Sequence, residues 1–250
     1  MESKKSSRGR PSETIYGLRA GLAVLARRPD DLQSIAYSRE VRRELQELLR
    51  FAASRRVPTR EATDDELARL AQSSHHEGLC LLTAARRWAS PQELADLLLQ
   101  RRGTAIALDR VRNPYNIGAI LRTAAFFGVD AALLGAPAPH PALPPDAVRV
   151  AEGGAEGLLL SRTTDLADTL GRLRERGVTV VGTAVADAHD ASTHVFARPA
   201  VLVVGHEREG MSDRVAAQCD ARVTIRGRGA VESLNVAVAT GVLVAQLTRT

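Results

Sequence analysis

Four short, almost wholly apolar segments in the second half of the chain restrict its fold more than any other feature. They are A-I-A-L-D at 105–109, V-D-A-A-L-L at 129–134, V-T-V-V-G at 178–182 and A-V-L-V-V-G at 200–205. Strands that are apolar on both faces, with helical stretches between them, predict a mostly parallel sheet covered by helices on both sides. Because ligands bind at the carboxyl ends of such strands, the loops that follow them are where we expect functional residues.

The residues before this region predict a smaller α/β unit of their own. We expect helices over 16–26 and 39–54 and strands over 32–37 and 78–83. The run Thr63-Asp64-Asp65-Glu66 has the pattern of a capping box and predicts a helix that continues to about Gln72. The chain then divides into a disordered basic tail (1–13), a first unit (14–84), a linker with a helix begun by Ser90-Pro91 (85–103) and a second unit (104–250).

The charge of the chain suggests a polyanionic partner. Its 250 residues carry a formal net charge of +5 with a pI of about 9.8, and 44% of them are hydrophobic, enough for a real core. All but two of the 34 basic residues are arginine, a bias that genome composition can also produce. Residues 1–10 are more specific, because their cations lie in a Ser/Gly-rich tract that cannot form a core and can contact nucleic-acid phosphates.

Other features concern the location of the protein and bound metals. The two cysteines, Cys80 and Cys219, lie in or beside apolar segments and lack the spacing of a zinc site or a disulfide framework, so we expect buried thiols and no metal. No apolar run reaches the roughly 18 residues of a membrane span, and residues 1–10 lack the apolar part of a signal peptide. We therefore expect a cytoplasmic protein that spans no membrane.

The first polar cluster follows the strand at 105–109 and reads D-R-V-R-N-P-Y-N-I-G at 109–118. Asn116 either caps the next helix or contributes to a site from the helix start. Arg122 lies six residues later in an apolar stretch of that helix, on a different face from Asn116. Arg122 either reaches solvent and pairs with a nearby carboxylate or serves the site.

Two further clusters follow later strands. In V-G-H-E-R-E-G-M-S at 204–212, glycines flank the carboxylate of Glu207, which is typical of an ordinary turn or of close approach to a ligand. In the segment 225–247, Ser233 is a natural cap and Asn235 lies at the buried start of a helix that is apolar nearly all round. Asn235 either satisfies the neighbouring loop or orients a glutamate or a ligand. No G-x-G-x-x-G follows a predicted strand, which disfavours a nicotinamide-dependent enzyme.

Together, these clusters resemble the motifs of the SpoU/TrmH group of SPOUT RNA methyltransferases. The matching pieces are N-P-Y-N-I-G-A-I-L-R-T-A, L-V-V-G-H-E-R-E-G-M and E-S-L-N-V-A-V-A-T-G, in that order. The first unit is similar, at Y-G-L-R-A-G-L and H-H-E-G-L, to the RNA substrate-binding domain often attached to this family, which has a ribosomal-protein-like fold. The resemblance implies a deep trefoil knot in the sheet, a homodimer, S-adenosylmethionine as cofactor, and methyl transfer to a ribose 2′-hydroxyl of RNA.

The resemblance also implies roles for individual residues. The family's functional polar residues match Asn116, Arg122, Glu207, Ser233 and Asn235, and its cofactor-contacting backbone matches Gly205, Ile225 and Leu234. Thr183, after another apolar strand, is a further candidate for contact with the cofactor. Arg122 is the group that activates the hydroxyl; since arginine stays charged, it acts by lowering the pKa of the hydroxyl and anchoring the adjacent phosphate, not as a base. Glu207 holds Arg122 within the chain or across the dimer, and Asn116 and Asn235 fix the loops.

The chain departs from the family pattern at three positions. His206, Arg226 and Ala237 stand where a small or amide residue, a proline and a serine are commoner. An alternative function is therefore a catalytically silent RNA-binding protein that keeps the fold. By analogy, the RNA-binding unit favours ribosomal over transfer RNA as the substrate.

Overall fold

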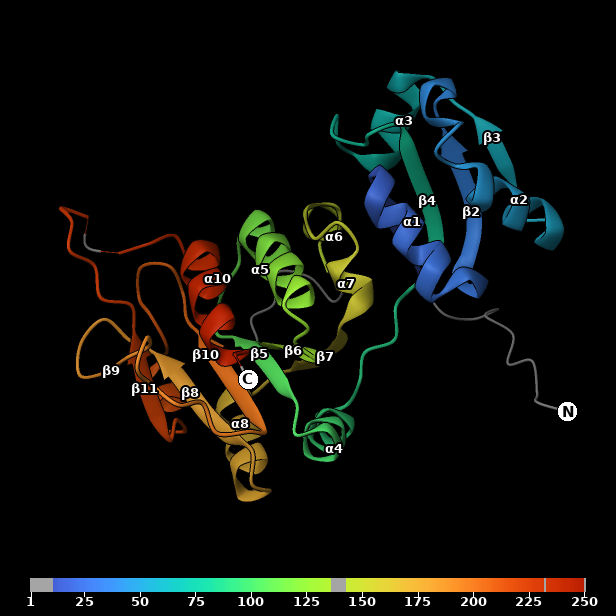
Figure 1. Cartoon of the computed structure of the whole chain (residues 1–250). Coiled ribbons are helices and arrows are strands. Elements are labelled where there is room, and N and C mark those ends of the chain that lie inside the picture. The colour runs from blue at the N-terminus through green and yellow to red at the C-terminus, as the bar shows by residue number, and fades with distance from the viewer. Residues whose placement is uncertain (1–10, 136–142, 232, 250) are drawn as a thin grey trace, which may run out of the picture.

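The computed structural model describes residues 11–135, 143–231 and 233–249, which form two α/β units (Figure 1). The smaller unit, Ser12–Ala84, contains a four-stranded sheet in the order β1-β4-β2-β3. Its strands are β1 (Ser12–Tyr16), β2 (Leu32–Tyr37), β3 (Thr59–Glu61) and β4 (Leu79–Ala84). Its helices are α1 (Leu18–Arg27), α2 (Gln46–Arg55) and α3 (Asp64–Ala71), with short 3₁₀ turns at Pro29–Asp31 and Arg39–Val41.

The sequence-based prediction for this unit is partly confirmed. The strands expected at 32–37 and 78–83 are present, and Thr63 caps α3 in a capping box with Glu66. The helix expected from Tyr16 is wrong at its start, because Tyr16 ends β1 and Gly17, with φ of 98°, turns the chain into α1. The helix expected over 39–54 begins as a 3₁₀ turn, and regular α2 starts only at Gln46.

The larger unit, Pro91–Leu247, contains a seven-stranded sheet in the order β7-β6-β5-β10-β8-β11-β9. Every neighbouring pair is parallel, which confirms the expected sheet. The strands are β5 (Thr104–Leu108), β6 (Ala131–Gly135), β7 (Leu159–Thr163), β8 (Thr179–Thr183), β9 (His189–Asp190), β10 (Ala200–Val204) and β11 (Ala221–Thr224). The sequence did not predict β7 or β9, and the strand that it expected directly before residue 225 is β11. The knot implied by the resemblance stays a prediction.

Helices cover both faces of this sheet (Figure 1). One face carries α5 (Pro114–Phe126), α6 (Pro145–Val150), α7 (Gly154–Gly157) and α10 (Val236–Leu247). The other carries α4 (Pro91–Arg101), α8 (Leu166–Glu175) and α9 (Asp213–Ala216). Alternate strand residues serve the two layers: in β5, Ile106 packs toward the first and Ala107 toward the second. This alternation is why the strands are apolar at consecutive positions.

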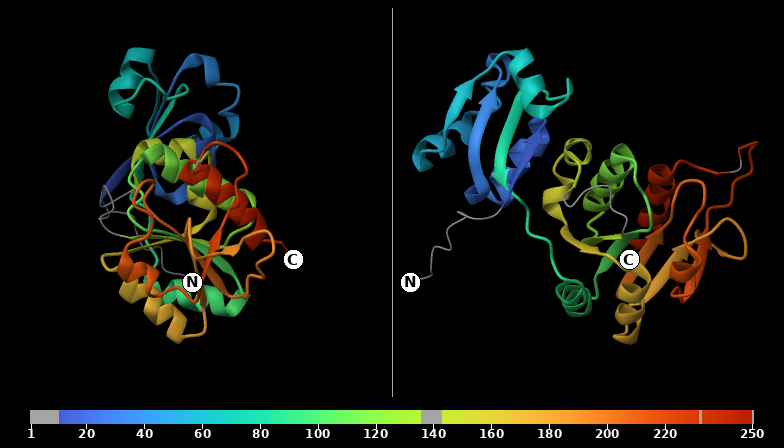
Figure 2. Two further views of the ribbon diagram at one scale, coloured as in Figure 1. Left: turned by 90° about the vertical axis from the view of Figure 1, so that its left-hand side faces the viewer. Right: turned by 180° about the vertical axis from the view of Figure 1, so that it is seen from behind.

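Helix α4 lies within the segment expected as a linker, but it belongs to the core of the larger unit. Ser90 and Glu93 form a capping box at its start, and Pro91 occupies the first turn. Its Leu94 and Leu98 are fully buried against the sheet. On the same face, Asp96 of α4 accepts a hydrogen bond from Arg176, just after α8, at 2.8 Å. Only the stretch between β4 and α4 runs extended between the two units (Figure 2).

A closed group of four charges joins the two units. Arg28 contacts Glu13 at 2.6 Å and Glu156 at 2.8 Å, while Arg86 contacts Glu156 at 3.0 Å and Glu13 at 3.4 Å. These four side chains are between 4% and 14% exposed, so we call them the buried ion cluster. Glu156 belongs to α7 and the other three to the smaller unit and the segment after it. Each charge has at least two opposite neighbours, and Arg28 has a third in Asp31 at 3.4 Å, which offsets the loss of hydration on burial.

The segment that carries Glu156 also packs closely on α5. A Cβ atom at Gly154 would lie 2.7 Å from the carbonyl oxygen of Leu121 and 2.9 Å from the Cα of Arg122. Just before it, Glu152 and Gly153 have φ angles of 45° and 95°. The chain between α6 and α7 thus turns through left-handed conformations and sets α7 against the backbone of α5.

Two sequence-based expectations fall on residues that the structure does not describe. Most of the basic tail expected over 1–13 lies within 1–10, but the disorder expected at its end is wrong, because Ser12 and Glu13 belong to β1. Most of the proline-rich loop expected at 135–145 lies within 136–142. Among the described residues, no helix combines the length and apolar character needed to cross a membrane.

Candidate functional site

Helix α5 follows the short loop after β5. Its cap is Asn113, which leaves the side chain of Asn116 free for another role. The side chain of Asn113 accepts a hydrogen bond from the backbone N–H of Tyr115 at 2.9 Å, and Pro114 occupies the first helical position. Of the two alternatives for Asn116, the helix cap is therefore excluded. Its side chain projects from the first turn of α5 toward the start of α10.

Helix α10 is capped by Asn235. Its Oδ1 accepts hydrogen bonds from the N–H groups of Ala237 at 2.8 Å and Val238 at 3.4 Å. The expectation that Ser233 is the cap is wrong, because the helix starts too late for its side chain to reach the free N–H groups. The expected burial of Asn235 is also wrong: the residue is exposed in the single chain.

Asn235, Asn116 and Glu207 form a directed chain of hydrogen bonds, which we call the amide relay. Asn235 Nδ2 donates to Asn116 Oδ1 at 3.1 Å, and Asn116 Nδ2 donates to Glu207 Oε1 at 2.7 Å. The helix N–H groups fix the orientation of the Asn235 amide, since only its oxygen can accept from them. That orientation determines the next one, so the relay ends on Glu207 as an acceptor. The structure thus brings together three of the five predicted polar residues.

The loop that carries Glu207 closes on itself. His206 and Gly210 exchange two backbone hydrogen bonds of 3.0 and 2.9 Å. A Cβ atom at Gly205 would lie 2.3 Å from the backbone of Gly210 and Met211, so only glycine fits there. The His206 Nδ1 atom accepts from the N–H of Arg208 at 3.3 Å, which makes this departure from the family pattern part of the turn.

Two residues that the sequence reasoning did not assign hold this loop to β5. Asp109 accepts a hydrogen bond from the N–H of Ser212 at 2.6 Å. Arg110 donates to the carbonyl of Gly210 at 3.0 Å and forms an ion pair with Glu209. The available signal was a pair of opposite charges directly after a buried strand.

Three of the four predicted cofactor positions lie at the carboxyl ends of neighbouring strands. Thr183, Gly205 and Ile225 lie at the carboxyl ends of β8, β10 and β11, which are neighbours in the sheet. Leu234 precedes the Asn235 cap, and its side chain is half exposed. Its backbone N–H and C=O make no hydrogen bond with other described residues. The side chain and the backbone polar groups of Leu234 are therefore accessible to a ligand.

Arg122 lies on the other flank of α5 from the amide relay. At 3.6 residues per turn, Asn116 and Thr123 share the flank that faces α10, and Arg122 faces α7. Arg122 Nη1 donates to Glu152 Oε1 at 2.9 Å. Within one chain, Glu207 therefore does not hold Arg122, and the nearby carboxylate considered as an alternative does. A contact between Arg122 and Glu207 across a dimer stays a prediction.

The other two departures have local explanations. Arg226 forms an ion pair with Asp190 at 3.3 Å. The hydroxyl and the N–H of Ser192, and then Arg226, hold the pKa of Asp190 below its usual value. At position 237 only the backbone N–H takes part in the cap, so alanine leaves the relay intact.

This chain is similar in sequence and in fold to known proteins. Residues 103–245 match the model of the SpoU rRNA Methylase family, and residues 14–89 match that of the RNA 2'-O ribose methyltransferase substrate binding domain. The 23S rRNA (guanosine-2'-O-)-methyltransferase RlmB of Vibrio cholerae is 35% identical over 95% of this chain and 97% of its own length. The uncharacterized tRNA/rRNA methyltransferase YfiF of Escherichia coli O157:H7 is 33% identical over 96% of this chain and 69% of its own length.

Solved structures share the fold over nearly the whole chain. An rRNA methyltransferase from Sinorhizobium meliloti superposes with a TM-score of 0.79 at 24% identity and covers 98% of this chain and 90% of that one. The SpoU methyltransferase AviRb from Streptomyces viridochromogenes, in complex with AdoMet, gives 0.79 at 22% identity over 99% and 93%. With the three ordered motifs and the amide relay they build, these matches establish that the chain belongs to the SpoU rRNA methylase family.

Proposed function

We propose that this protein transfers a methyl group from S-adenosylmethionine to a ribose 2′-hydroxyl of ribosomal RNA. The observation that carries the proposal is the intact amide relay, which lies between the ends of β5 and β10 and the start of α10. The relative named as a 23S rRNA methyltransferase over almost its full length supports ribosomal over transfer RNA. We place the protein in the cytoplasm, where that substrate is found.

The residues at the sheet edge fit the cofactor. The free N–H and C=O of Leu234 and the hydroxyl of Thr183 can hydrogen-bond a nucleoside, and the side chains of Ile225 and Leu234 provide apolar surface for a purine. Gly205 keeps its loop tight enough to end beside them. When bound, S-adenosylmethionine supplies an electrophilic methyl group. Ser233, exposed just before Leu234, is proposed to contact the cofactor or the ribose.

Arg122 prepares the hydroxyl for attack. Because its guanidinium stays protonated, it lowers the pKa of the 2′-hydroxyl and holds the neighbouring phosphate, and the proton leaves to a phosphate oxygen or to water. Asn116 and Asn235 orient the loops, and Glu207 receives the end of the relay. The contribution of these residues is alignment, which turns the encounter of two reactants into a reaction within one complex.

We propose that the active form is a homodimer. Between the two flanks of α5 runs a stripe through positions 115, 119 and 126, and α10 continues it. Five large apolar side chains on these helices are exposed in the single chain: Tyr115, Phe126, Phe127, Val238 and Val242. A second copy that covers the stripe around a two-fold axis brings the Arg122 flank of one subunit toward the amide relay of the other.

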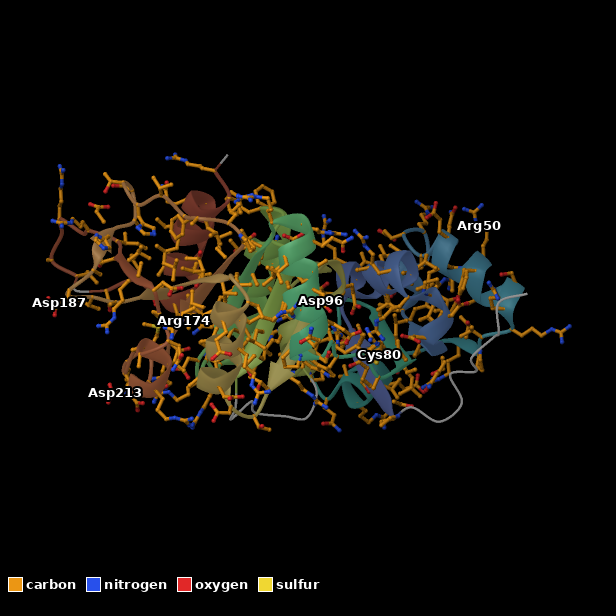
Figure 3. The ribbon with its side chains drawn as sticks, turned by 90° about the horizontal axis from the view of Figure 1, so that it is seen from below. Arg50, Cys80, Asp96, Arg174, Asp187 and Asp213 are labelled. Carbon is orange, nitrogen blue, oxygen red and sulfur yellow. The ribbon has the colours of Figure 1, made fainter. Side chains whose placement is uncertain are left out.

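We further propose that the smaller unit binds RNA, that the stretch between β4 and α4 links the units, and that the larger unit, α4 included, carries the reaction. In the smaller unit, Arg43, Arg50 and Arg56 are exposed, and none of them forms an ion pair with the other described residues. Arg50 points outward at the end of this unit that lies away from the larger one (Figure 3). Unpaired arginines on an open surface suit phosphate contacts.

Substitution of Arg122 tests the reaction. We expect Arg122→Ala to keep its fold and its affinity for S-adenosylmethionine, measured by calorimetry, and to lose methyl transfer to ribosomal RNA. Arg172→Ala, which removes an exposed arginine paired with Asp168 on α8, is the matched control and is expected to keep activity. An active Arg122→Ala variant would refute the role of this residue. Folded wild-type protein that binds RNA but not the cofactor would support the silent RNA-binding alternative.

The dimer has a separate test. Light scattering is expected to give twice the chain mass of 26.8 kDa at micromolar concentration. Phe126→Glu places a charge in the exposed stripe and is expected to yield a folded monomer. A wild-type mass equal to that of one chain would contradict the dimer.

A further inference from the structure

We propose that Arg19 and Arg122 form one binding site for a phosphate of the RNA backbone, and that Glu152 fills this site until RNA arrives. Glu152 Oε1 contacts Arg122 Nη1 at 2.9 Å, and Glu152 Oε2 lies 3.6 Å from Arg19 Nε. The site rests on the proposed function only in taking RNA as the ligand. No role in methyl transfer is needed for it.

The site lies where the two units of the protein meet. Arg19 belongs to α1 of the smaller unit and Arg122 to α5 of the larger one, and α7 lies between these two helices (Figure 1). Glu152 is placed just before α7 in a left-handed conformation. The buried ion cluster holds one side of this segment at Glu156, and Gly154 sets the other side against α5. The carboxylate is thus held at a fixed point between the two arginines.

The geometry of the contacts indicates a phosphate as the ligand. Each carboxylate oxygen of Glu152 faces a different guanidinium. A phosphodiester also offers two anionic oxygens, and guanidinium groups bind such oxygens with directed N–H bonds. Two arginines around one carboxylate therefore form a place that a backbone phosphate can occupy with the same bonding pattern.

The exposure of these side chains and the weakness of their ion pairs both allow an RNA phosphate to replace the carboxylate of Glu152. The side chains of Arg19, Arg122 and Glu152 are 74%, 56% and 35% exposed, so an RNA strand can reach all three. Ion pairs this exposed are weak, and a phosphate that gains two arginines can replace the carboxylate. RNA bound to the smaller unit would then release Arg122 from Glu152 as it delivers a phosphate to the catalytic unit.

Removal of the resident carboxylate tests the site through RNA binding alone. The probe is a protein-free 23S rRNA transcript, whose phosphates bind largely without regard to sequence, measured by filter binding with the full-length chain over a range of salt. We expect Glu152→Gln to bind about two- to fivefold more tightly at low salt, because phosphate no longer competes with the carboxylate. We expect Arg19→Gln to bind more weakly, with a salt slope smaller by about one.

Two controls separate this site from a general charge effect. Glu175→Gln makes the same change in net charge at an exposed position at the end of α8, where the carboxylate forms no ion pair with the described residues. It is expected to leave binding nearly unchanged. In the Arg19→Gln/Arg122→Gln background, Glu152→Gln is expected to give no tightening, because the two arginines that it frees are gone.

Three results would overturn the proposal: Glu152→Gln that binds no better than Glu175→Gln, weaker binding by Glu152→Gln, or the same tightening without the two arginines. Thermal unfolding of each variant checks that the fold is kept. Methyl transfer is measured separately. If the wild type shows none while the arginine-dependent tightening is present, the proposed reaction is refuted and the phosphate site stands.

Discussion

Glu152 and Glu156 lie four residues apart, the first just before α7 and the second within it, yet their surroundings are opposite. Glu156 is 4% exposed and bound by Arg28 and Arg86, whereas Glu152 is 35% exposed and lies between Arg19 and Arg122. Both carboxylates face one arginine pair. They differ in the access of water, and the arginines of Glu156 are shared with Glu13.

That difference separates a structural role from a functional one. Buried ions that lose a partner remain stripped of hydration, so their pairs hold the two units in place. Exposed ions regain water when a pair opens, which makes the Glu152 pairs poor sources of stability and easy to exchange for a ligand. The two kinds of ion pair on one short segment thus combine a fixed joint with a replaceable contact.

The largest expected effect on stability comes from Glu156, the buried carboxylate of the two. Glu156→Gln leaves Arg28 and Arg86 with one carboxylate fewer, and we expect the free energy of unfolding in urea to fall by about 3–5 kcal/mol. Glu152→Gln, the matched variant, is expected to change it by less than about 1 kcal/mol. Equal losses in the two variants would remove the distinction between them.

A second pair of variants extends the comparison to the two helix caps. Asn235→Ala and Asn113→Ala each remove a cap, and each is expected to lower stability by about 1 kcal/mol in the same denaturation experiment. Asn235 also carries the amide relay and Asn113 does not. We therefore expect at least a tenfold larger loss of methyl transfer for Asn235→Ala. Similar activities would show that the relay has no part in the reaction.

The smallest expected effect on stability concerns Glu93, an exposed carboxylate that accepts a hydrogen bond from the backbone. The N–H of Ser90, then Arg87 and the Ser90 hydroxyl, lower the pKa of Glu93 to about 2. Because the folded pKa lies below the unfolded value, this contribution is complete above about pH 5 and is lost as pH falls toward 2. Glu93→Gln is expected to lose less stability than the wild type over that range. An NMR titration midpoint of Glu93 near 4.5 would contradict the lowered pKa.

The sequence predicted those parts of the fold that depend on local signals. The apolar strands β5, β6, β8 and β10, the capping box at Thr63 and the cap at Ser90 were predicted because each signal lies within a few residues. By contrast, β1 was assigned in part to a helix. Its main partner is β4, about seventy residues away, and nothing in S-E-T-I-Y reveals that pairing.

The site, too, was predicted only where the signal is local in the sequence. The motifs pointed to Asn116, Glu207 and Asn235, and the structure joins them in one relay. The partner of Arg122 was assigned to Glu207, because no pattern in the sequence places Glu152 next to it. That contact depends on the left-handed turn at Glu152 and on the packing of Gly154 against α5. Both are set by the tertiary structure and leave no local signal in the sequence.

The contact of Gly154 with α5 has a consequence for how this sequence can vary. One added methyl group at position 154 would act as a spacer between α7 and the backbone of Arg122, whereas at Gly157 it would meet only the methyl group of Ala125 at 3.8 Å. In a library of substitutions selected for function, position 154 should therefore accept nothing but glycine while position 157 accepts alanine. The distance between α5 and α7 therefore depends on the absence of a side chain at position 154.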